Sequence, residues 1–204
     1  MLARNPDQTR KTLLEAAYEE IRHYGFQAAS LSRILTKAGL TKGALYHHFP
    51  TKLALGYAVV DEVIHEEILN CWATPLADCE DPVDCLVNLL QKAAEGAGRE
   101  FIEMGCPLNN LAQEMSPVDE GFRQKLGHIY TLWRQALANA LARGQENGKV
   151  RPDVNPAAAS IFIVAAIEGC LGMAKNARDI NLLFECGEGL LHYLDTLRAK
   201  PLNL

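Results

Sequence analysis

Apolar positions recur at three- and four-residue steps along nearly the whole chain, which is the spacing of one face of an α-helix. The first such stretch, residues 7–24, places Leu13, Leu14 and Ile21 on one face, and Gly25 provides a stop signal. No convincing two-residue alternation of the kind that marks a strand is present. The pattern therefore predicts an all-α fold.

Helix-breaking and capping residues divide this pattern into nine predicted helices. Ser30, Thr41 and Thr51 each stand where a hydroxyl can cap a helix N-terminus, and Pro50 ends the helix before the last of them. The helices predicted to begin at 82, 107 and 117 have a proline at that position, which suits a first turn. The predicted helices cover residues 7–24, 31–38, 42–49, 52–72, 82–104, 107–115, 117–147, 156–177 and 179–199.

Charge is distributed unevenly over these helices. The chain of 204 residues has a net charge of −5, yet residues 1–52 carry a net +4 and residues 53–204 a net −9. A small basic head can engage phosphate while an acidic body stays soluble, although ordinary charge fluctuation gives the same numbers. We therefore expect two domains, a small basic head (1–52) that can engage an anionic partner and a larger acidic helical body (53–204).

Residues 30–49 combine two short amphipathic helices with a glycine-containing turn, which is the helix-turn-helix arrangement. Gly39 suits a turn residue with positive φ. Six apolar residues form the predicted inner face, which packs on the first helix: Leu31, Ile34, Leu35, Leu40, Leu45 and Phe49.

The opposite face of the second short helix is basic and aromatic. Lys42, Gly43, Tyr46 and His47 follow the order i, i+1, i+4 and i+5, which makes a single stripe narrow enough for a major groove about 12 Å wide. Ser30 and Thr41 lie near helix N-termini, where hydroxyl and amide groups can hold phosphate. A solvated helix surface is the alternative interpretation of this stripe.

These residues resemble the DNA-binding domain of the tetracycline-repressor (TetR) family. The match comprises Thr41-Lys42-Gly43, then Tyr46-His47-His48-Phe49, then Lys52, within a chain whose length and nine predicted helices also fit the family. The resemblance implies a nine-helix architecture, with a three-helix DNA-binding domain followed by a helical ligand-binding and dimerisation domain. It implies a ligand-responsive repressor that binds a palindromic operator as a homodimer and is released by an unknown small-molecule effector.

The resemblance also assigns roles to individual residues. Thr41 and Lys42 would lie at the groove, and Gly43 would allow close approach to the duplex. Tyr46, His47 and Lys52 would contact phosphates. Phe49 belongs to the core, and His48 has no assigned role.

Dimerisation is expected through the last two helices. Residues 156–177 are rich in small residues, which permit close helix approach, and residues 179–199 carry apolar residues at helical spacing. An intrachain core face fits the same periodicity, and the resemblance favours the interface.

A ligand pocket is expected among the helices from 82 to 147, where polar or aromatic residues interrupt apolar faces, with Glu168 as a buried carboxylate that needs a partner. Structural packing is the alternative for each. The candidate ligand-binding residues are Asn109, Asn110, Gln113, Tyr130, Trp133 and Glu168. Cys106, beside a helix N-terminus, is a candidate thiol sensor with Lys175 nearby, and an inert cysteine is its alternative.

Several other classes of function lack a signal in the sequence. No P-loop, dinucleotide fingerprint, HExxH or nucleophile elbow is present, so we expect no catalytic residue, no metal and no cofactor. No secretory leader or membrane span is expected, which predicts a cytoplasmic protein with six reduced cysteines. A helical small-molecule-binding protein without a DNA role, and a redox- or electrophile-sensing repressor that uses Cys106, are the alternative functions.

Overall fold

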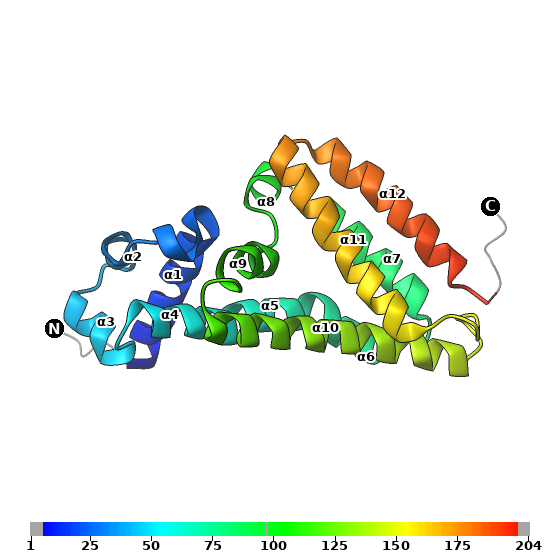
Figure 1. Ribbon diagram of the computed structural model, residues 1–204, viewed down its shortest axis with the longest axis horizontal. Coiled ribbons are helices and arrows are strands. Elements are labelled where there is room, and N and C mark those ends of the chain that lie inside the picture. The colour runs from blue at the N-terminus through cyan, green and yellow to red at the C-terminus, as the bar shows by residue number, and fades with distance from the viewer. Residues whose placement is uncertain (1–5, 97, 200–204) are drawn as a thin grey trace. The chain divides into compact units, whose positions relative to one another are not determined.

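The computed structural model describes residues 6–96 and 98–199, which are helical apart from short turns (Figure 1). Within these ranges the one β-type pairing is an isolated bridge between Val150 and Arg198, so the predicted all-α class is confirmed. The elements are α1 (Pro6–Ala28), α2 (Leu31–Ala38), α3 (Lys42–His48), α4 (Lys52–Ala58), η1 (Val59–Ile64), α5 (His65–Ile68), η2 (Leu69–Ala73), α6 (Thr74–Ala77), α7 (Pro82–Glu95), α8 (Arg99–Met104), α9 (Pro107–Met115), α10 (Glu120–Glu146), α11 (Pro156–Ala177) and α12 (Ile180–Thr196).

The chain forms two compact units. Unit 1 comprises Met1–Glu67 and Pro107–His128, and unit 2 comprises Ile68–Cys106 and Ile129–Leu204. Helix α9 and the beginning of α10 therefore fold with the N-terminal helices. The predicted boundary after residue 52 is a boundary between functions, and it stays a prediction.

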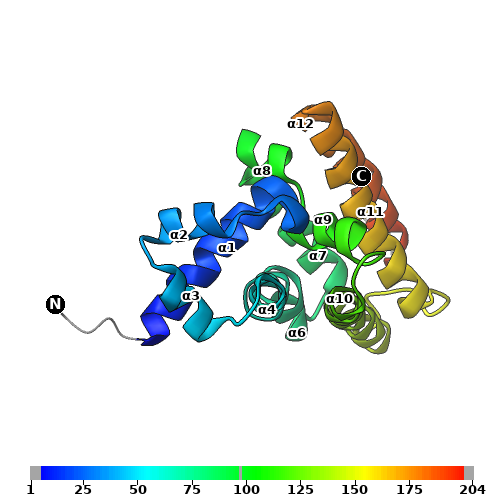
Figure 2. The same ribbon diagram turned by 60° about the vertical axis from the view of Figure 1, so that its left-hand side comes forward.

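In unit 1, the two short helices α2 and α3 lie against α1 (Figure 2). Leu13 of α1 is fully buried, and Ile34, Leu45 and Phe49 are 1–3% exposed. Leu35 is also buried, whereas Leu31 and Leu40 are half-buried at the edge of the same face. Burial of one apolar side per helix holds α2 and α3 in place, because neither is long enough to be stable alone.

The predicted helix ends are confirmed at the positions that form the helix-turn-helix. The side chains of Ser30, Thr41 and Thr51 each accept a hydrogen bond from the backbone amide three residues later, over 3.4, 3.3 and 3.0 Å. Gly39 ends α2 with φ of 62°. Gly25 interrupts α1 with φ of 76°, a backbone conformation in which a side chain would be strained.

The helix predicted for residues 52–72 continues as a helical run to Ala77 through two π-helical segments, η1 and η2. Pro75 was expected to belong to a loop, but it lies inside this run. A proline ring normally clashes with the carbonyl four residues before it, here that of Cys71. Cys71 lies in η2, where the wider π-helical turn accommodates the missing amide.

Two other predicted helix bounds are wrong. The helix predicted over 82–104 is divided into α7 and α8, because Gly96 and Gly98 end the first helix and begin the second. The helix predicted from Pro117 begins at Glu120, because the Asp119 carboxylate accepts from the Phe122 amide over 2.9 Å and caps the helix there.

The expectation of six reduced cysteines is also wrong for this structure. Disulfides join Cys79 to Cys85, and Cys170 of α11 to Cys186 of α12, with Cα–Cα distances of 6.4 and 5.8 Å. Cys71 and Cys106 take no part in these two disulfides. The helix pairing that brings residues 170 and 186 together cannot be inferred from cysteine spacing alone.

Unit 2 is built on the antiparallel pair α11 and α12, which lie side by side in Figure 1. Trp133 of α10 is 1% exposed and stacks on Trp72, with ring centroids 5.2 Å apart. The C-terminal end of the described chain is fixed by Arg198, which is 8% exposed and forms ion pairs with Asp84 and Asp195 over 2.7 and 3.0 Å.

A carboxylate from α9 fixes the end of α1 within unit 1. The two oxygens of Glu114 accept from the backbone amides of Phe26 and Gln27, each over 2.8 Å. These amides follow Gly25, where a Cβ atom would come within 2.7 Å of the same carboxylate. The connection that leads into α2 is therefore positioned by Glu114.

Replacing Glu114 by alanine is expected to lower the free energy of unfolding by about 1–3 kcal/mol, because two amides lose their acceptor. Glu114→Gln keeps one acceptor oxygen and should cost less. Urea unfolding of the three proteins measures the effect. Equal stability of the alanine variant and the parent would show that water replaces the carboxylate without cost.

Candidate nucleic-acid interface

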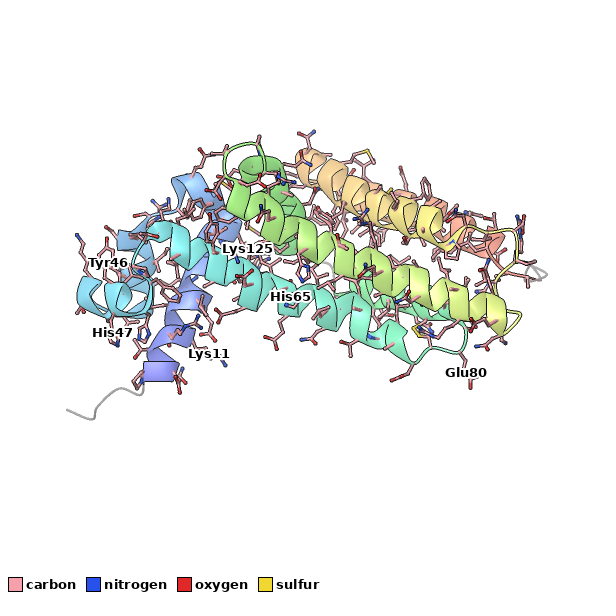
Figure 3. All side chains as sticks on the ribbon, turned by 60° about the horizontal axis from the view of Figure 1, so that its bottom comes forward. Lys11, Tyr46, His47, His65, Glu80 and Lys125 are labelled. Atoms are coloured by element: carbon pink, nitrogen blue, oxygen red, sulfur yellow. A yellow bond between two sulfur atoms is a disulfide. The ribbon has the colours of Figure 1, made fainter. Side chains whose placement is uncertain are left out.

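The stripe predicted on α3 is exposed in the structure. Lys42, Gly43, Tyr46 and His47 all face solvent, with Tyr46 51% exposed, whereas the neighbouring Leu45 is 1% exposed. Figure 3 shows Tyr46 and His47 together on α3. On an α-helix, Tyr46 and His47 are rotated by about 100° and 200° from the buried Leu45, which places them away from the core. One short helix thus presents a cation, a phenol and an imidazole on its solvent side.

Gly43 lies in open space on this stripe. A Cβ atom built there would have Thr41 Oγ1 as its nearest neighbour, at 3.8 Å. The protein's own packing therefore does not require glycine at position 43. A small residue is useful there only if a second surface comes close to the backbone, which agrees with the predicted approach of a duplex.

Ser30 and Thr41 serve first as helix caps. Each hydroxyl oxygen accepts one backbone amide, as described above, and the hydroxyl proton of each can still be donated to an acceptor such as a phosphate oxygen. Thr41 is exposed and Ser30 is half-buried. Their phosphate contacts remain predictions.

Lys52 has a partner inside unit 1. Its Nζ donates to the Gln27 carbonyl over 3.0 Å and lies 4.9 Å from the centre of the Phe26 ring. Burial lowers the pKa of this lysine. The ammonium has three N–H donors, so a phosphate contact of Lys52, which stays a prediction, can form beside the bond to Gln27.

Sequence reasoning missed a second polar cluster beside the helix-turn-helix. Arg33 of α2 donates through Nε to the buried carboxylate of Glu20 over 2.7 Å, and its guanidinium lies 4.3 Å from the centre of the Tyr24 ring. Tyr24 is 54% exposed. The sequence signal was the glutamate on the apolar side of α1, since a buried carboxylate needs a cation. This cluster joins α1 to α2 and adds an exposed aromatic ring to the surface.

The six predicted ligand-binding residues divide between the two units. Asn109, Asn110 and Gln113 lie on α9 in unit 1, where the Gln113 amide donates to Asn109 over 3.5 Å. Unit 2 contains the other three: Tyr130 and Trp133 on α10, and Glu168 on α11. Their roles in ligand binding remain predictions.

Cys106 and Glu168 form a polar contact inside unit 2. The half-buried Cys106 thiol donates to Glu168 Oε1 over 3.1 Å, whereas Oε2 of this buried carboxylate has no hydrogen-bond partner. Burial raises the pKa of Glu168 to about 7, opposed by the bond from Cys106. Burial also raises the pKa of Tyr130. Lys175 lies on the same helix as Glu168, about two turns further on. A thiol-sensing role for Cys106 stays a prediction.

An apolar cavity of about 300 Å³ in unit 2 was not predicted. It lies between α7, α8, α11 and α12, with Trp72 of η2 in its wall, and none of the six predicted residues lines it. Its lining residues follow the same helical periodicity as the core. The sequence therefore could not separate residues that face a cavity from residues that face each other.

Two further observations concern metals and membranes. The described part of the chain contains no group of three or more His, Cys, Asp or Glu side chains that could hold a metal ion. Among the same residues, one helix, Pro156–Ala177, is long and apolar enough to cross a bilayer by length and composition. Core helices pass the same test, and the inner face of this one is buried in unit 2.

The raised pKa of Glu168 makes stability depend on pH. The folded chain binds this proton more tightly than the unfolded chain, whose carboxyl has a pKa near 4.5, so the stabilisation is complete at low pH and is lost as the pH rises to about 7. Glu168→Gln should match the parent protein near pH 4, below the unfolded pKa, and exceed its stability at pH 8 by at most about 3 kcal/mol. Urea unfolding at both pH values measures this. A difference that is the same at pH 4 and pH 8 would contradict the assignment.

Comparisons with known proteins agree with this geometry. The family described as "Bacterial regulatory proteins, tetR family" matches residues 13–59, and "Tetracyclin repressor-like, C-terminal domain" matches residues 82–184, about half of the chain. The HTH-type transcriptional repressor DhaR of Mycobacterium sp. strain GP1 is 26% identical over 87% of each chain. The A-factor receptor protein of Streptomyces griseus is 30% identical over 79% of this chain and 53% of its own.

The fold is likewise that of solved regulators. The crystal structure of a TetR transcriptional regulator from Chloroflexus aurantiacus superposes with a TM-score of 0.83 at 24% identity, over 96% of this chain and 98% of that one. Both the helix-turn-helix region and the C-terminal region therefore match the same family. The chain belongs to the TetR family of DNA-binding transcriptional regulators.

Proposed function

We propose that this regulator is a repressor that binds a palindromic operator as a homodimer through α3 and is released when a small molecule binds its C-terminal region. The exposed stripe of Lys42, Gly43, Tyr46 and His47 carries this proposal. A cation and two hydrogen-bonding rings on one helix face can contact phosphates and base edges together. The activity is binding, without a catalytic step. Because the operator must be reached, we place the protein in the cytoplasm.

A homodimer is needed because one seven-residue helix reads only a few base pairs. Two copies related by a two-fold axis would place their α3 helices one DNA turn apart, about 34–36 Å, on a palindrome. The solvent side of α11 supports this arrangement. It is apolar, and its exposed residues are four small ones and three large ones: Ala158, Ala165, Gly169 and Gly172, with Ile161, Phe162 and Met173.

The apolar stripe predicted on α12 faces mostly inward. Leu190 and Leu194 are buried, while Phe184 is 44% exposed. The proposed interface is therefore centred on α11, with a smaller contribution from α12. In this arrangement one side of α11 is buried by its own unit and the other side by a second copy. A helix buried on both sides is expected to be apolar all round, as α11 is.

Release is proposed to act through the helical run that begins at Lys52 and ends at Ala77. This run directly follows the helix-turn-helix and contains the π-helical segments η1 and η2. π-Helical segments are rare interruptions of α-helices and are frequently found at functional sites. A ligand that favours another arrangement of this run would lower the affinity for the operator.

Lys42→Ala tests the DNA-reading face. Removing one phosphate or base contact is expected to lower operator affinity about tenfold and to reduce the slope of log affinity against log salt by about 0.9. Lys149→Ala is the matched control, because Lys149 is an exposed lysine of the loop before α11. Fluorescence anisotropy with operator DNA at several salt concentrations gives both quantities. Equal losses in the two variants would mean that net charge, not the α3 stripe, accounts for binding.

Gly169→Leu tests the dimer. No atom lies within 4 Å of a Cβ built at this position, so one chain can accept leucine without a clash, whereas a closely packed second copy cannot. The dimer dissociation constant is expected to rise at least about tenfold, or 1.4 kcal/mol. Gly127→Leu on α10, which is equally open, is the control. Sedimentation equilibrium measures both variants, and an unchanged dimer for Gly169→Leu would exclude α11 as the interface.

A further inference from the structure

The apolar cavity in unit 2 has the size of a small-molecule site. Its volume of about 300 Å³ lies at the lower end of the range for ligand pockets. Leu90 of α7, Phe101 of α8, Leu171 of α11 and Phe184 of α12 contribute one wall each. Four helices thus line a partly open apolar space that their own side chains do not fill.

The lining of this cavity disfavours a negatively charged ligand. Its polar side chains are Gln91 and Glu188, and the described residues that line it include no lysine, arginine or histidine. An anionic ligand would lose its hydration and meet a carboxylate instead of a cation. An uncharged apolar molecule loses little hydration and gains contact with every wall.

One wall is an aromatic platform. Trp72 lines the cavity and stacks on Trp133, with the two ring planes at 29°. Trp133 is 1% exposed and therefore fixed in the core, so the ring that stacks on it, Trp72, is fixed as well. A fixed indole offers area for offset or edge-to-face contact with a second aromatic ring.

We propose that this cavity is the effector site and that the effector is an uncharged molecule with an aromatic ring system. This inference rests on the proposed function as an operator-binding regulator. Trp72 also supplies the link to regulation, because it belongs to η2, the π-helical segment of the run that begins at Lys52. A ring packed on Trp72 contacts this π-helical segment directly, and such segments are frequently found at functional sites.

Two dyes with the same ring system test the charge preference. N-phenyl-1-naphthylamine is neutral, and 8-anilinonaphthalene-1-sulfonate is its sulfonated form. The neutral dye is expected to bind one per chain, with energy transfer from tryptophan, and at least about tenfold more tightly than the sulfonate, a difference of 1.4 kcal/mol. Absence of saturable binding by the neutral dye, or equal affinity for both, would overturn the proposed ligand class.

A pair of glycine variants locates the dye. Gly187 lines the cavity and Gly189 does not, while a Cβ at either position meets no atom within 4 Å. Gly187→Leu fills space in the cavity and should weaken binding of the neutral dye at least about tenfold, whereas Gly189→Leu should leave it unchanged. Circular dichroism and sedimentation confirm that both variants keep their fold and assembly state. Equal effects of the two variants would place the dye elsewhere.

Operator release separates this inference from the proposed function. With operator DNA selected from a random pool, the neutral dye should release the parent protein and the Gly189→Leu variant, but not Gly187→Leu. If the operator is bound and the dye occupies the cavity without release, the effector assignment is wrong and the regulator remains. If no DNA is selected, the proposed function fails, while the dye titration still decides whether the cavity takes neutral aromatic molecules.

Discussion

A helix of seven residues has too few internal hydrogen bonds to persist alone in water, so α3 exists only because the rest of unit 1 holds it. Leu45 and Phe49 are buried beneath it, and Thr41 caps its first turn. The same burial fixes the rotation of the helix. With Leu45 directed inward, Tyr46 and His47 are turned toward solvent, so the packing of α3 and the exposure of the proposed DNA-reading stripe have one cause.

That constraint extends beyond the N-terminal helices. Glu114 of α9 holds the amides after Gly25, and Phe122 of α10 packs on Phe26, with ring centroids 4.7 Å apart. The segment Pro107–His128 thus belongs to the DNA-reading unit, although it comes from the middle of the chain. Cys106, the residue before it, belongs to unit 2 and bonds to Glu168. At the crossing after residue 106, the last residue of unit 2 is therefore held by a polar contact within its own unit.

Local chemistry made much of unit 1 predictable from sequence. Ser30, Thr41 and Thr51 cap helices in the structure because a hydroxyl before a helical segment satisfies an amide whatever the tertiary context. Gly39 adopts the positive φ expected of a turn. The exposed stripe followed from periodicity, since only one rotation of α3 buries its apolar residues.

Features that depend on distant residues were not predictable in the same way. The pairing of Cys170 with Cys186 requires the register of α11 against α12, which no local signal encodes. The cavity wall at Trp72 and Phe184 has the same apolar spacing as a filled core. Two start signals lie close together before α10, a proline at 117 and a capping aspartate at 119. The helix begins at Glu120 because the Asp119 side chain caps it.

The central claim is that two copies of α3 lie in successive major grooves of the operator. Methylation protection of guanine N7 on a selected operator tests it most directly, because N7 is exposed in the major groove. The account predicts two protected patches on one face of the duplex, centred about 10 base pairs apart. Protection confined to adenine N3 in the minor groove, or a single protected patch, would contradict it.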